Sequence, residues 1–305
     1  MNRILVLGST NIDLIARVSH LPLPGETVGQ AEFMQANGGK GANQAVSVAR
    51  LGGDVGFVTC LGNDSQAKLL RQQFLADGIN LDGIIITNAA PTGTALIFVA
   101  DNAENCIAVA PGANNRITPT DIDALESYIT KAEFMLLQLE IPMCVVQYAI
   151  SKAVTANVKV VLNPAPATDL SDDLLHKLYL ITPNRTECEA LTGLVIQNIE
   201  DAEKAADILL SKGVKNVIIT LGREGALLKN QSICALIPAL QVQAVDTTAA
   251  GDVFNGALLV ALAEGCSLLD AARFATAASS IAVTRMGAQP SIPWRKEVDK
   301  LVKRD

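Results

Sequence analysis

Short apolar runs alternate with longer segments of helical periodicity along most of the chain. The apolar runs have the length and β-branched content of buried strands, and they cover residues 3–8, 55–62, 133–140, 158–164, 178–184 and 214–222. The segments of helical spacing include 41–52, 65–78 and 201–213, and each ends at a glycine. This alternation predicts an α/β fold whose mainly parallel central sheet carries helices on both faces, with right-handed crossovers.

Two segments, about 14–36 and 92–110, depart from this alternation. Their sequence is extended and alternating, with turn signals at Pro24-Gly25 and Asn102 and no helical segment between. We predict that these segments form a small antiparallel sheet separate from the main sheet. It would lie above the carboxyl ends of the parallel strands and act as a lid. The expected organisation is one domain over residues 1–305.

Composition narrows the class of protein. Half of the 305 residues are hydrophobic, 18% are charged and only 4% are aromatic, which is typical of buried parallel strands covered by helices. The net charge of −7 argues against a nucleic-acid partner, because phosphate binding needs clustered Lys and Arg. No apolar run reaches the roughly 18 residues of a membrane span, so no membrane partner is expected.

The cysteines and the start of the chain indicate a reducing compartment. The six cysteines are widely spread, form no C-x-x-C pair, and have only two histidines to join them in a zinc site. Residues 1–14 favour a first strand over a signal peptide, since Asp13 interrupts them and no cleavage site follows. We therefore expect buried, unpaired cysteines and a cytoplasmic location.

The glycine-rich stretch NGGKGANQA, residues 37–45, admits two interpretations. It lacks the spacing of a Walker loop, and a dinucleotide fingerprint is absent after the first strand. It is either a turn that precedes a helix, or a place where the backbone of Gly38 and Gly39 closely approaches a hydroxylated ligand that Asn43 also reaches.

Other polar residues follow predicted strands. Asn11 and Asp13 are two positions apart at the end of the first strand, and this pair suits vicinal hydroxyls, although a polar loop is an equal alternative. Glu140 ends another strand. Asn184 and Glu187 have the spacing of a capping box, which needs no chemistry, and residues 220–227 form a turn between two strands.

Asp252 lies where a polar turn, VDTTAAGD, becomes an apolar helix. A carboxylate in the first turn is favourable beside the helix dipole. It is also well placed to serve as a base next to free backbone N–H groups. This stretch alone leaves both possibilities open.

Taken together, these motifs are specific. NGGKGANQA with AVDTTAAGDVFNG resembles the two signatures of the ribokinase, or PfkB, family of sugar kinases, and Asn11-Ile12-Asp13, Asn184-x-x-Glu187, TLGREG (220–225) and GAQPSIPW (287–294) follow in the family's order. The resemblance covers essentially the whole chain. It implies a three-layer ribokinase-like fold with a β lid.

The resemblance also implies a mechanism. Asp252 is the general base for the 5-hydroxyl of D-ribose as it attacks the γ-phosphate of ATP, giving D-ribose 5-phosphate and ADP. The N–H groups of Ala249, Ala250, Gly251 and Asp252 form an anion hole. The sugar-binding residues that it implies are Asn11, Asp13, Gly39, Lys40, Gly41, Ala42, Asn43, Ala95, Ile97, Glu140 and Asp252. The ATP-binding residues are Asn184, Thr220, Leu221, Gly222, Arg223, Glu224, Gly225, Gly251, Asp252 and Thr276, the last replacing a His or Asn frequent in the family.

Metal ions and a partner subunit follow from the same likeness. Glu187 is implied to order water around Mg²⁺. An activating K⁺ is implied at Asp246, Thr248, Ala282, Arg285, Gly287 and Ser291. Members of the family clasp each other through their lids, so a homodimer is expected. The alternatives are a kinase of the same family for deoxyribose, another sugar or a nucleoside, and a catalytically silent sugar-binding protein, against which the intact Asp252 argues.

Overall fold

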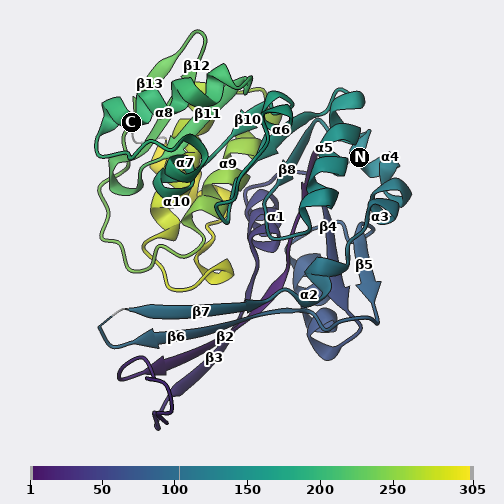
Figure 1. Cartoon of the computed structure of the whole chain (residues 1–305), viewed down its shortest axis with the longest axis vertical. Helices are drawn as coiled ribbons and strands as arrows, with labels where there is room; N and C mark the ends of the chain where they lie inside the picture. Colours follow the sequence, from purple (N-terminus) through teal and green to yellow (C-terminus); the bar gives the residue numbers. More distant parts are fainter. Residues whose placement is uncertain (1–2, 103, 303–305) are drawn as a thin grey trace.

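A nine-stranded sheet forms the centre of the computed structural model, which describes residues 3–102 and 104–302. In pairing order its strands are β13 (Cys234–Ile237), β12 (Ala226–Asn230), β11 (Asn216–Thr220), β10 (Leu180–Ile181), β9 (Lys159–Leu162), β8 (Phe134–Leu137), β1 (Ile4–Leu7), β4 (Val55–Gly62) and β5 (Ile84–Thr87). The strands β5, β4, β1, β8, β9, β10 and β11 are parallel to one another, and β12 and β13 extend the sheet antiparallel. The mainly parallel sheet predicted from the apolar runs is confirmed (Figure 1).

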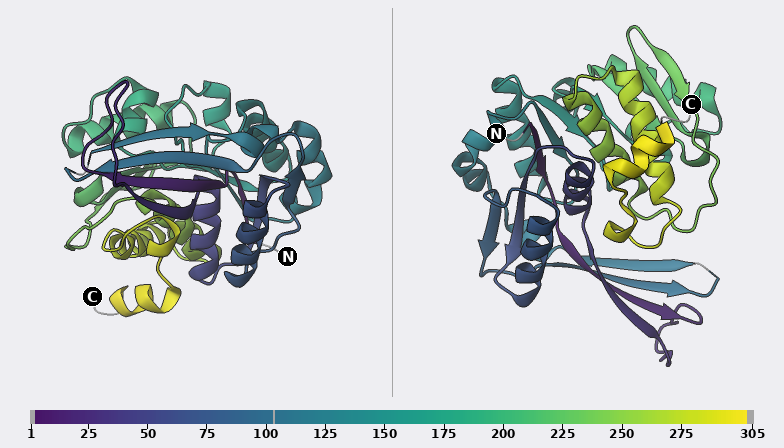
Figure 2. Two further views of the ribbon diagram at one scale, coloured as in Figure 1. Left: turned by 90° about the horizontal axis from the view of Figure 1, so that it is seen from below. Right: turned by 180° about the vertical axis from the view of Figure 1, so that it is seen from behind.

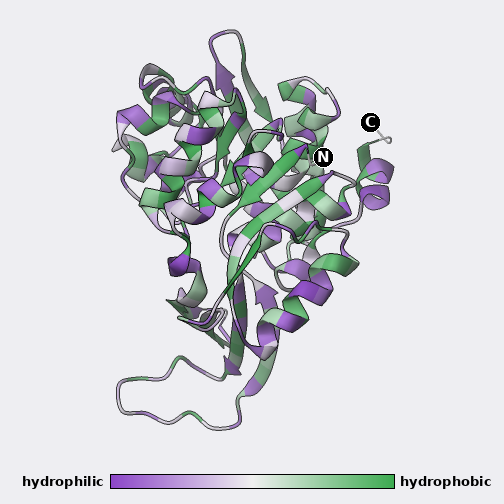
Figure 3. Cartoon of the chain, turned by 90° about the vertical axis from the view of Figure 1, so that its right-hand side faces the viewer, coloured by the Kyte–Doolittle hydropathy of each residue, from purple (hydrophilic) through white to green (hydrophobic). Residues whose placement is uncertain are grey.

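Helices cover both faces of this sheet because its strands are apolar on both sides. Alternate residues divide between two cores, with Ile4 and Val6 in one and Leu5 and Leu7 in the other. Helices of the first face are α1 (Lys40–Arg50), α2 (Ser65–Ala76), α9 (Ala250–Ala263), α10 (Leu268–Ala282) and α11 (Arg295–Val302). Helices of the second face are α3 (Pro119–Ala124), α4 (Glu126–Ile129), α5 (Met143–Thr155), α6 (Asp172–His176), α7 (Arg185–Thr192) and α8 (Ile199–Ser211). Figure 3 shows the central strands largely in the hydrophobic colour.

Short 3₁₀ turns complete the connections, at Gly112–Arg116, Gly222–Glu224 and Gln289–Ser291. The second of these joins β11 to β12, where a turn between two strands is predicted. No helix in the described part of the chain is long and apolar enough to cross a membrane.

A four-stranded sheet extends from one end of the main body (Figures 1 and 2). It consists of β3 (Glu32–Gly38), β2 (Asn11–Val18), β6 (Gly93–Ala100) and β7 (Asn105–Ala110), in that order. The antiparallel pairs β2–β3 and β6–β7 agree with the prediction, and they are joined by a parallel pairing of β2 with β6. A parallel central pair arises because the whole of α1, β4, α2 and β5 lies between the two hairpins in the chain.

The cysteines correct one expectation. All six are free, but only Cys60 and Cys188 are buried, whereas Cys106, Cys144, Cys234 and Cys266 are exposed. Cys106 and Cys234 are exposed because they lie on the edge strands β7 and β13.

Candidate active site

Eight of the candidate residues line a cavity of about 170 Å³. It lies at the starts of α1, α7 and α9, beside the carboxyl ends of the central strands. Its lining is Lys40, Asn163, Ala165, Thr182, Asn184, Glu187, Thr220, Thr247, Ala249, Ala250, Gly251, Asp252 and Asn255. A ligand pocket at this edge of an open α/β sheet is the expected place, because crossover loops diverge there.

Asp252 is held by side chains of another helix. It lies in the first turn of α9 and is only 6% exposed. Its Oδ2 accepts a hydrogen bond from Asn43 Nδ2 (3.0 Å) and its Oδ1 one from Gln44 Nε2 (2.9 Å), both from α1. Burial raises the pKa of Asp252, while Lys40 and the two amides act in the opposite direction. The carboxylate is thus anchored in a specific orientation, which a mere first-turn charge does not require.

The start of α9 leaves donors free. Ala249 precedes the helix in the left-handed conformation (φ 61°), which a non-glycine residue rarely adopts. The Ala250 N–H bonds to the Thr247 carbonyl (3.2 Å), but the N–H groups of Gly251 and Asp252 have no acceptor among the described residues. Because nothing within 4 Å would meet a side chain at Gly251, this end of the helix is open to an anion.

Three carboxylates surround Lys40. Burial lowers the pKa of Lys40, but Asp252, Glu140 and Glu187 outweigh it, so the net shift is upward and the ammonium stays charged. Glu140 Oε2 also accepts the Lys40 backbone N–H (3.0 Å) and the Ser9 hydroxyl (2.5 Å). Lys40 therefore provides a fixed positive charge beside Asp252.

Asn11 and Asp13 lie on β2 of the four-stranded sheet, which corrects their predicted place at the end of the first strand. That strand ends at Leu7, and residues 8–10 separate it from β2 because Thr10 bonds to Asn114 instead of continuing the ladder. Burial, and next the charge of Glu140, raise the pKa of Asp13 to about 7.

Glycines allow the backbone to approach these side chains. A Cβ at Gly38 would lie 2.2 Å from Asp13 Oδ2, and one at Gly39 (φ 87°) would lie 2.7 Å from the Asn11 backbone nitrogen. Gly41 packs with equal closeness against Gly8 and Ser9, and Ala42 is buried beside it. At all three glycines the backbone comes too close to neighbouring atoms for a side chain, and this explains the glycines of this stretch.

Asn114 orients Asn11, and the sequence did not point to it. Asn114 Oδ1 accepts the Thr10 N–H (2.9 Å), so its amide nitrogen must face Asn11 Oδ1 (2.8 Å). Asn11 consequently directs its own Nδ2 away from Asn114, and this donor has no acceptor within the described part of the chain.

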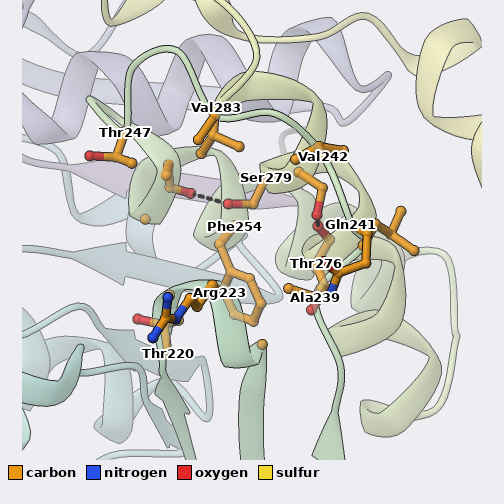
Figure 4. A pocket seen from close by; sticks show the side chains of 17 residues that line it. Thr220, Arg223, Ala239, Gln241, Val242, Thr247, Phe254, Thr276, Ser279 and Val283 are labelled. Carbon is orange, nitrogen blue, oxygen red and sulfur yellow. Dashed lines mark hydrogen bonds between the residues drawn. The ribbon is translucent and has the colours of Figure 1, made fainter.

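A second pocket of about 300 Å³ continues from the first, with Thr220, Thr247, Ala250 and Gly251 shared between them. Its lining is Thr220, Gly222, Arg223, Gly225, Ala239, Leu240, Gln241, Val242, Ala244, Thr247, Ala250, Gly251, Phe254, Thr276, Ser279, Ser280 and Val283. Figure 4 shows Phe254 between Arg223 and Thr276. The Ser279 hydroxyl donates to the Ala250 carbonyl (2.9 Å) and so ties α10 to the start of α9.

Only some of the residues predicted to bind ATP line this pocket. Thr220, Gly222, Arg223, Gly225, Gly251 and Thr276 line it. Leu221 is buried in the core and Glu224 pairs with Arg185 (3.1 Å), so neither side chain lies in the lining. The Thr276 hydroxyl donates to the Ala272 carbonyl (2.9 Å) of its own helix. The lining loop 239–244 carried no motif, which is why sequence reasoning missed it.

Asn184 and Glu187 form the capping box that their spacing predicts, and they also line the first cavity. Asn184 N–H donates to Glu187 Oε2 (2.8 Å). Burial raises the pKa of Glu187, while the Asn184 N–H and Lys40 oppose the shift. The two interpretations of this motif are therefore compatible.

Asp246, Thr248 and Gly287 come together as the resemblance implies. Asp246 Oδ1 accepts the Thr248 N–H (2.9 Å) and hydroxyl, and Oδ2 accepts the Gly287 N–H (2.8 Å). The Val283 carbonyl joins the two segments by accepting the Asp246 N–H (3.2 Å).

The other residues implied at the cation site have their side chains engaged or apolar. Arg285 pairs with Glu297 and the Ser291 hydroxyl donates to Ala288, so these two residues and Ala282 have carbonyls to offer. No cluster of three acidic, Cys or His residues that suits a metal ion occurs within residues 3–102 and 104–302.

Ala95 is buried and Ile97 half-buried on β6, where Ala95 pairs with Asp13. These two residues share the Asp13 face of the four-stranded sheet, since side chains alternate along a strand. The lid residues named from the sequence thus lie on the face that carries the polar candidate.

Comparisons with known proteins find similar sequences and structures over nearly the whole chain. The family described as pfkB family carbohydrate kinase matches residues 1–295. A ribokinase of Haemophilus influenzae is 44% identical over 96% of this chain and 95% of its own. A solved structure of Arabidopsis thaliana ribokinase with ribose and ATP has a TM-score of 0.92 at 34% identity, covering 99% of each chain. A deoxyribokinase of Salmonella typhi is 35% identical over 95% of both chains.

Proposed function

The chain belongs to the pfkB family of carbohydrate kinases, and we propose from this premise that it transfers the γ-phosphoryl group of ATP to O5 of D-ribose. The products are D-ribose 5-phosphate and ADP. The observation that carries the proposal is the anchored Asp252 carboxylate beside Lys40 and the free N–H groups of α9.

In the proposed mechanism Asp252 accepts the proton of the 5-hydroxyl as the oxygen attacks phosphorus. The positive end of α9, with the N–H groups of Gly251 and Asp252, stabilises negative charge on the transferred group. Lys40 adds a fixed charge. Phosphoryl transfer depends mainly on such positioning and charge stabilisation.

The sugar side is proposed to read hydroxyl groups with both acceptors and donors. Asp13 and Glu140 accept hydrogen bonds from hydroxyls, and Asn11 offers its Nδ2, which has no partner among the described residues. Asn43 Oδ1 is buried without a partner among the described residues, so it suits another sugar hydroxyl.

The nucleotide is proposed to lie in the larger pocket with its phosphates toward Gly251. Glu187 fits a role near Mg²⁺, because its buried carboxylate lines the small cavity beside Asp252. No cluster of three metal-binding side chains occurs among the described residues, so phosphates and water are left as the remaining ligands. The Asp246 loop fits K⁺, which would hold the start of α9 in place through Thr247 and Thr248.

The four-stranded sheet is proposed to close over the sugar and to join two subunits. Phe33, Leu96 and Phe98 are 68%, 47% and 38% exposed, and their strand positions put them on the face opposite Asp13. An apolar face of this kind on a projecting sheet favours burial against a second copy.

The test is a coupled assay of ADP release with D-ribose, 2-deoxyribose, hexoses and nucleosides. We expect kcat/KM for ribose to exceed that for 2-deoxyribose by roughly 10- to 150-fold, because a missing hydroxyl leaves a buried polar group unpaired at about 1.5–3 kcal/mol. Better turnover of 2-deoxyribose would favour the activity of the Salmonella relative instead. No turnover of any substrate would favour a silent sugar-binding protein.

A further inference from the structure

Buried amide side chains connect Asp252 to the carboxyl ends of the central strands. Gln44 Nε2 donates both to Asp252 Oδ1 (2.9 Å) and to Asn163 Oδ1 (3.0 Å). Gln44 Oε1 accepts from Gln138 Nε2, which follows β8. Asn163, directly after β9, donates onward to the Thr182 carbonyl (3.2 Å).

Each amide side chain in this hydrogen-bonded network has one permitted orientation. An ionised carboxylate only accepts hydrogen bonds, so Gln44 must turn its nitrogen toward Asp252. Its oxygen then needs a donor, which Gln138 supplies. Because Asn163 accepts from Gln44, its nitrogen is left for the Thr182 carbonyl. Gln138 Oε1 is the one amide atom of this network that is buried without a partner among the described residues, and the remaining bonds specify one orientation for Gln44.

The same network of hydrogen bonds also reaches the start of α9 through Thr182 and Asn255. The Thr182 hydroxyl donates to Asn255 Oδ1 (2.6 Å), and Asn255 Nδ2 donates to the Gly251 carbonyl (2.8 Å). The Gly251 carbonyl and the Asp252 N–H belong to one planar peptide unit. Fixing the carbonyl therefore fixes the direction of the N–H that points to the proposed anion hole.

We propose that Gln44 is a positioning residue for phosphoryl transfer: from inside the protein it sets the orientation of the Asp252 carboxylate. Gln44 has 0% exposure, so it acts through Asp252 without touching the substrate. Its neighbour Asn43 differs, because Asn43 keeps a free oxygen for a ligand. The proposal rests on the proposed function of Asp252 as the base.

The charges around Asp252 determine how this residue responds to a change at Gln44. Lys40 on α1 favours the ionised carboxylate, whereas Glu140 after β8 and Glu187 on α7 disfavour it. The Asn43 and Gln44 amides both lower the pKa of Asp252 against the effect of burial. Loss of the Gln44 donor therefore favours the protonated, inactive base.

The experiment replaces Gln44 by a side chain of similar length without donors, Gln44→Met. At pH 7.5 kcat and kcat/KM for the sugar should fall together by about 10- to 100-fold, because misplacing a reacting group acts on the transition state. The acid limb of kcat should move to higher pH, and KM for ATP should not change. The control is Asn216→Leu, which removes another buried amide at the start of β11, where it donates to the Tyr179 carbonyl (2.9 Å). It should lower the melting temperature and leave the pH profile alone.

A second variant, Gln44→Glu, keeps the shape if Gln44→Met does not fold. A carboxyl group there forms a coupled pair with Asp252, whose two apparent pKa values are pushed apart, so the acid limb of kcat moves away from its wild-type position. An acid limb at the wild-type position in the folded variants overturns the proposal, even where activity falls.

The wild-type sugar panel separates this inference from the proposed function. If another sugar is phosphorylated in place of ribose, the ribose assignment fails and Gln44 is tested with that sugar. A wild type that phosphorylates nothing refutes both.

Discussion

The Asp13 carboxyl should make the use of ribose depend on pH near neutrality. Burial and Glu140 raise the pKa of this group to about 7, so a fraction of the free enzyme carries a protonated Asp13 at neutral pH. The ionised form accepts hydrogen bonds from two sugar hydroxyls, whereas the protonated form is itself a donor. Ribose should therefore bind the ionised form.

The size of the effect follows from the titration. With a pKa of about 7 the ionised fraction is about one tenth at pH 6 and about nine tenths at pH 8, and kcat/KM reports groups of the free enzyme. We expect kcat/KM for ribose to rise by roughly eightfold to tenfold between pH 6 and pH 8. The acid limb of kcat belongs to the complex, and in the proposed mechanism Asp252 sets it, so the two profiles should differ.

The assay is ADP release at saturating ATP and Mg²⁺, with ribose varied at each pH between 5.5 and 8.5. Asp13→Asn should remove the pH dependence of kcat/KM near pH 7 and weaken the binding of ribose. KM for ATP should stay the same. A value of kcat/KM that is constant from pH 6 to pH 8 in the wild type would refute the reasoning.

Stability provides an independent check of the same pKa. The native pKa of about 7 exceeds the ordinary 3.8, so between these values the folded state binds the proton more tightly and stability falls as the pH rises. Above pH 7 the loss is complete and amounts to at most about 4 kcal/mol, because the pKa rises from 3.8 to about 7 on folding. Asp13→Asn should therefore melt at a higher temperature than the wild type at pH 8, with a smaller difference at pH 5.

Two further predictions concern the start of α9. Asp252→Asn should keep the fold and ribose binding but lower kcat by roughly 10²- to 10⁴-fold, the usual effect of losing a positioned base, and near-normal kcat in the purified variant would contradict the assignment. Turnover should be higher in potassium than in lithium salts at equal ionic strength, because a cation held at Asp246 orders the loop that leads to Gly251. Equal rates in the two salts would remove the cation site.

Local pattern was sufficient for the layers of the fold. The run 55–62 becomes β4 over the same residues, because a short, mainly apolar stretch rich in β-branched and aromatic side chains favours a strand covered on both faces. The helix predicted over 65–78 begins at Ser65, since Asp64 caps it by accepting the Ala67 N–H (2.8 Å). The order of the family motifs along the chain likewise indicated Asp252, Lys40 and Asp13 as candidate site residues.

Contacts between distant segments could not be predicted from the sequence. Asn114 meets Asn11 across about a hundred positions, and Gln44 meets Asp252 across about two hundred, as the numbering shows. A lone amide residue carries no signal of its partner, because an exposed and a buried asparagine look alike in sequence. The protonation of Asp13 depends on burial and on Glu140, and neither is a local property.

The sequence by itself therefore determined which elements form and which motifs they carry, because periodicity, caps and glycine positions act over a few residues. The tertiary structure alone decided that β2 pairs in parallel with β6, that loop 239–244 lines the larger pocket, and that buried amides bond to Asp252. These features arise where strands and helices from the whole chain meet, so their energies depend on distances that no local pattern encodes.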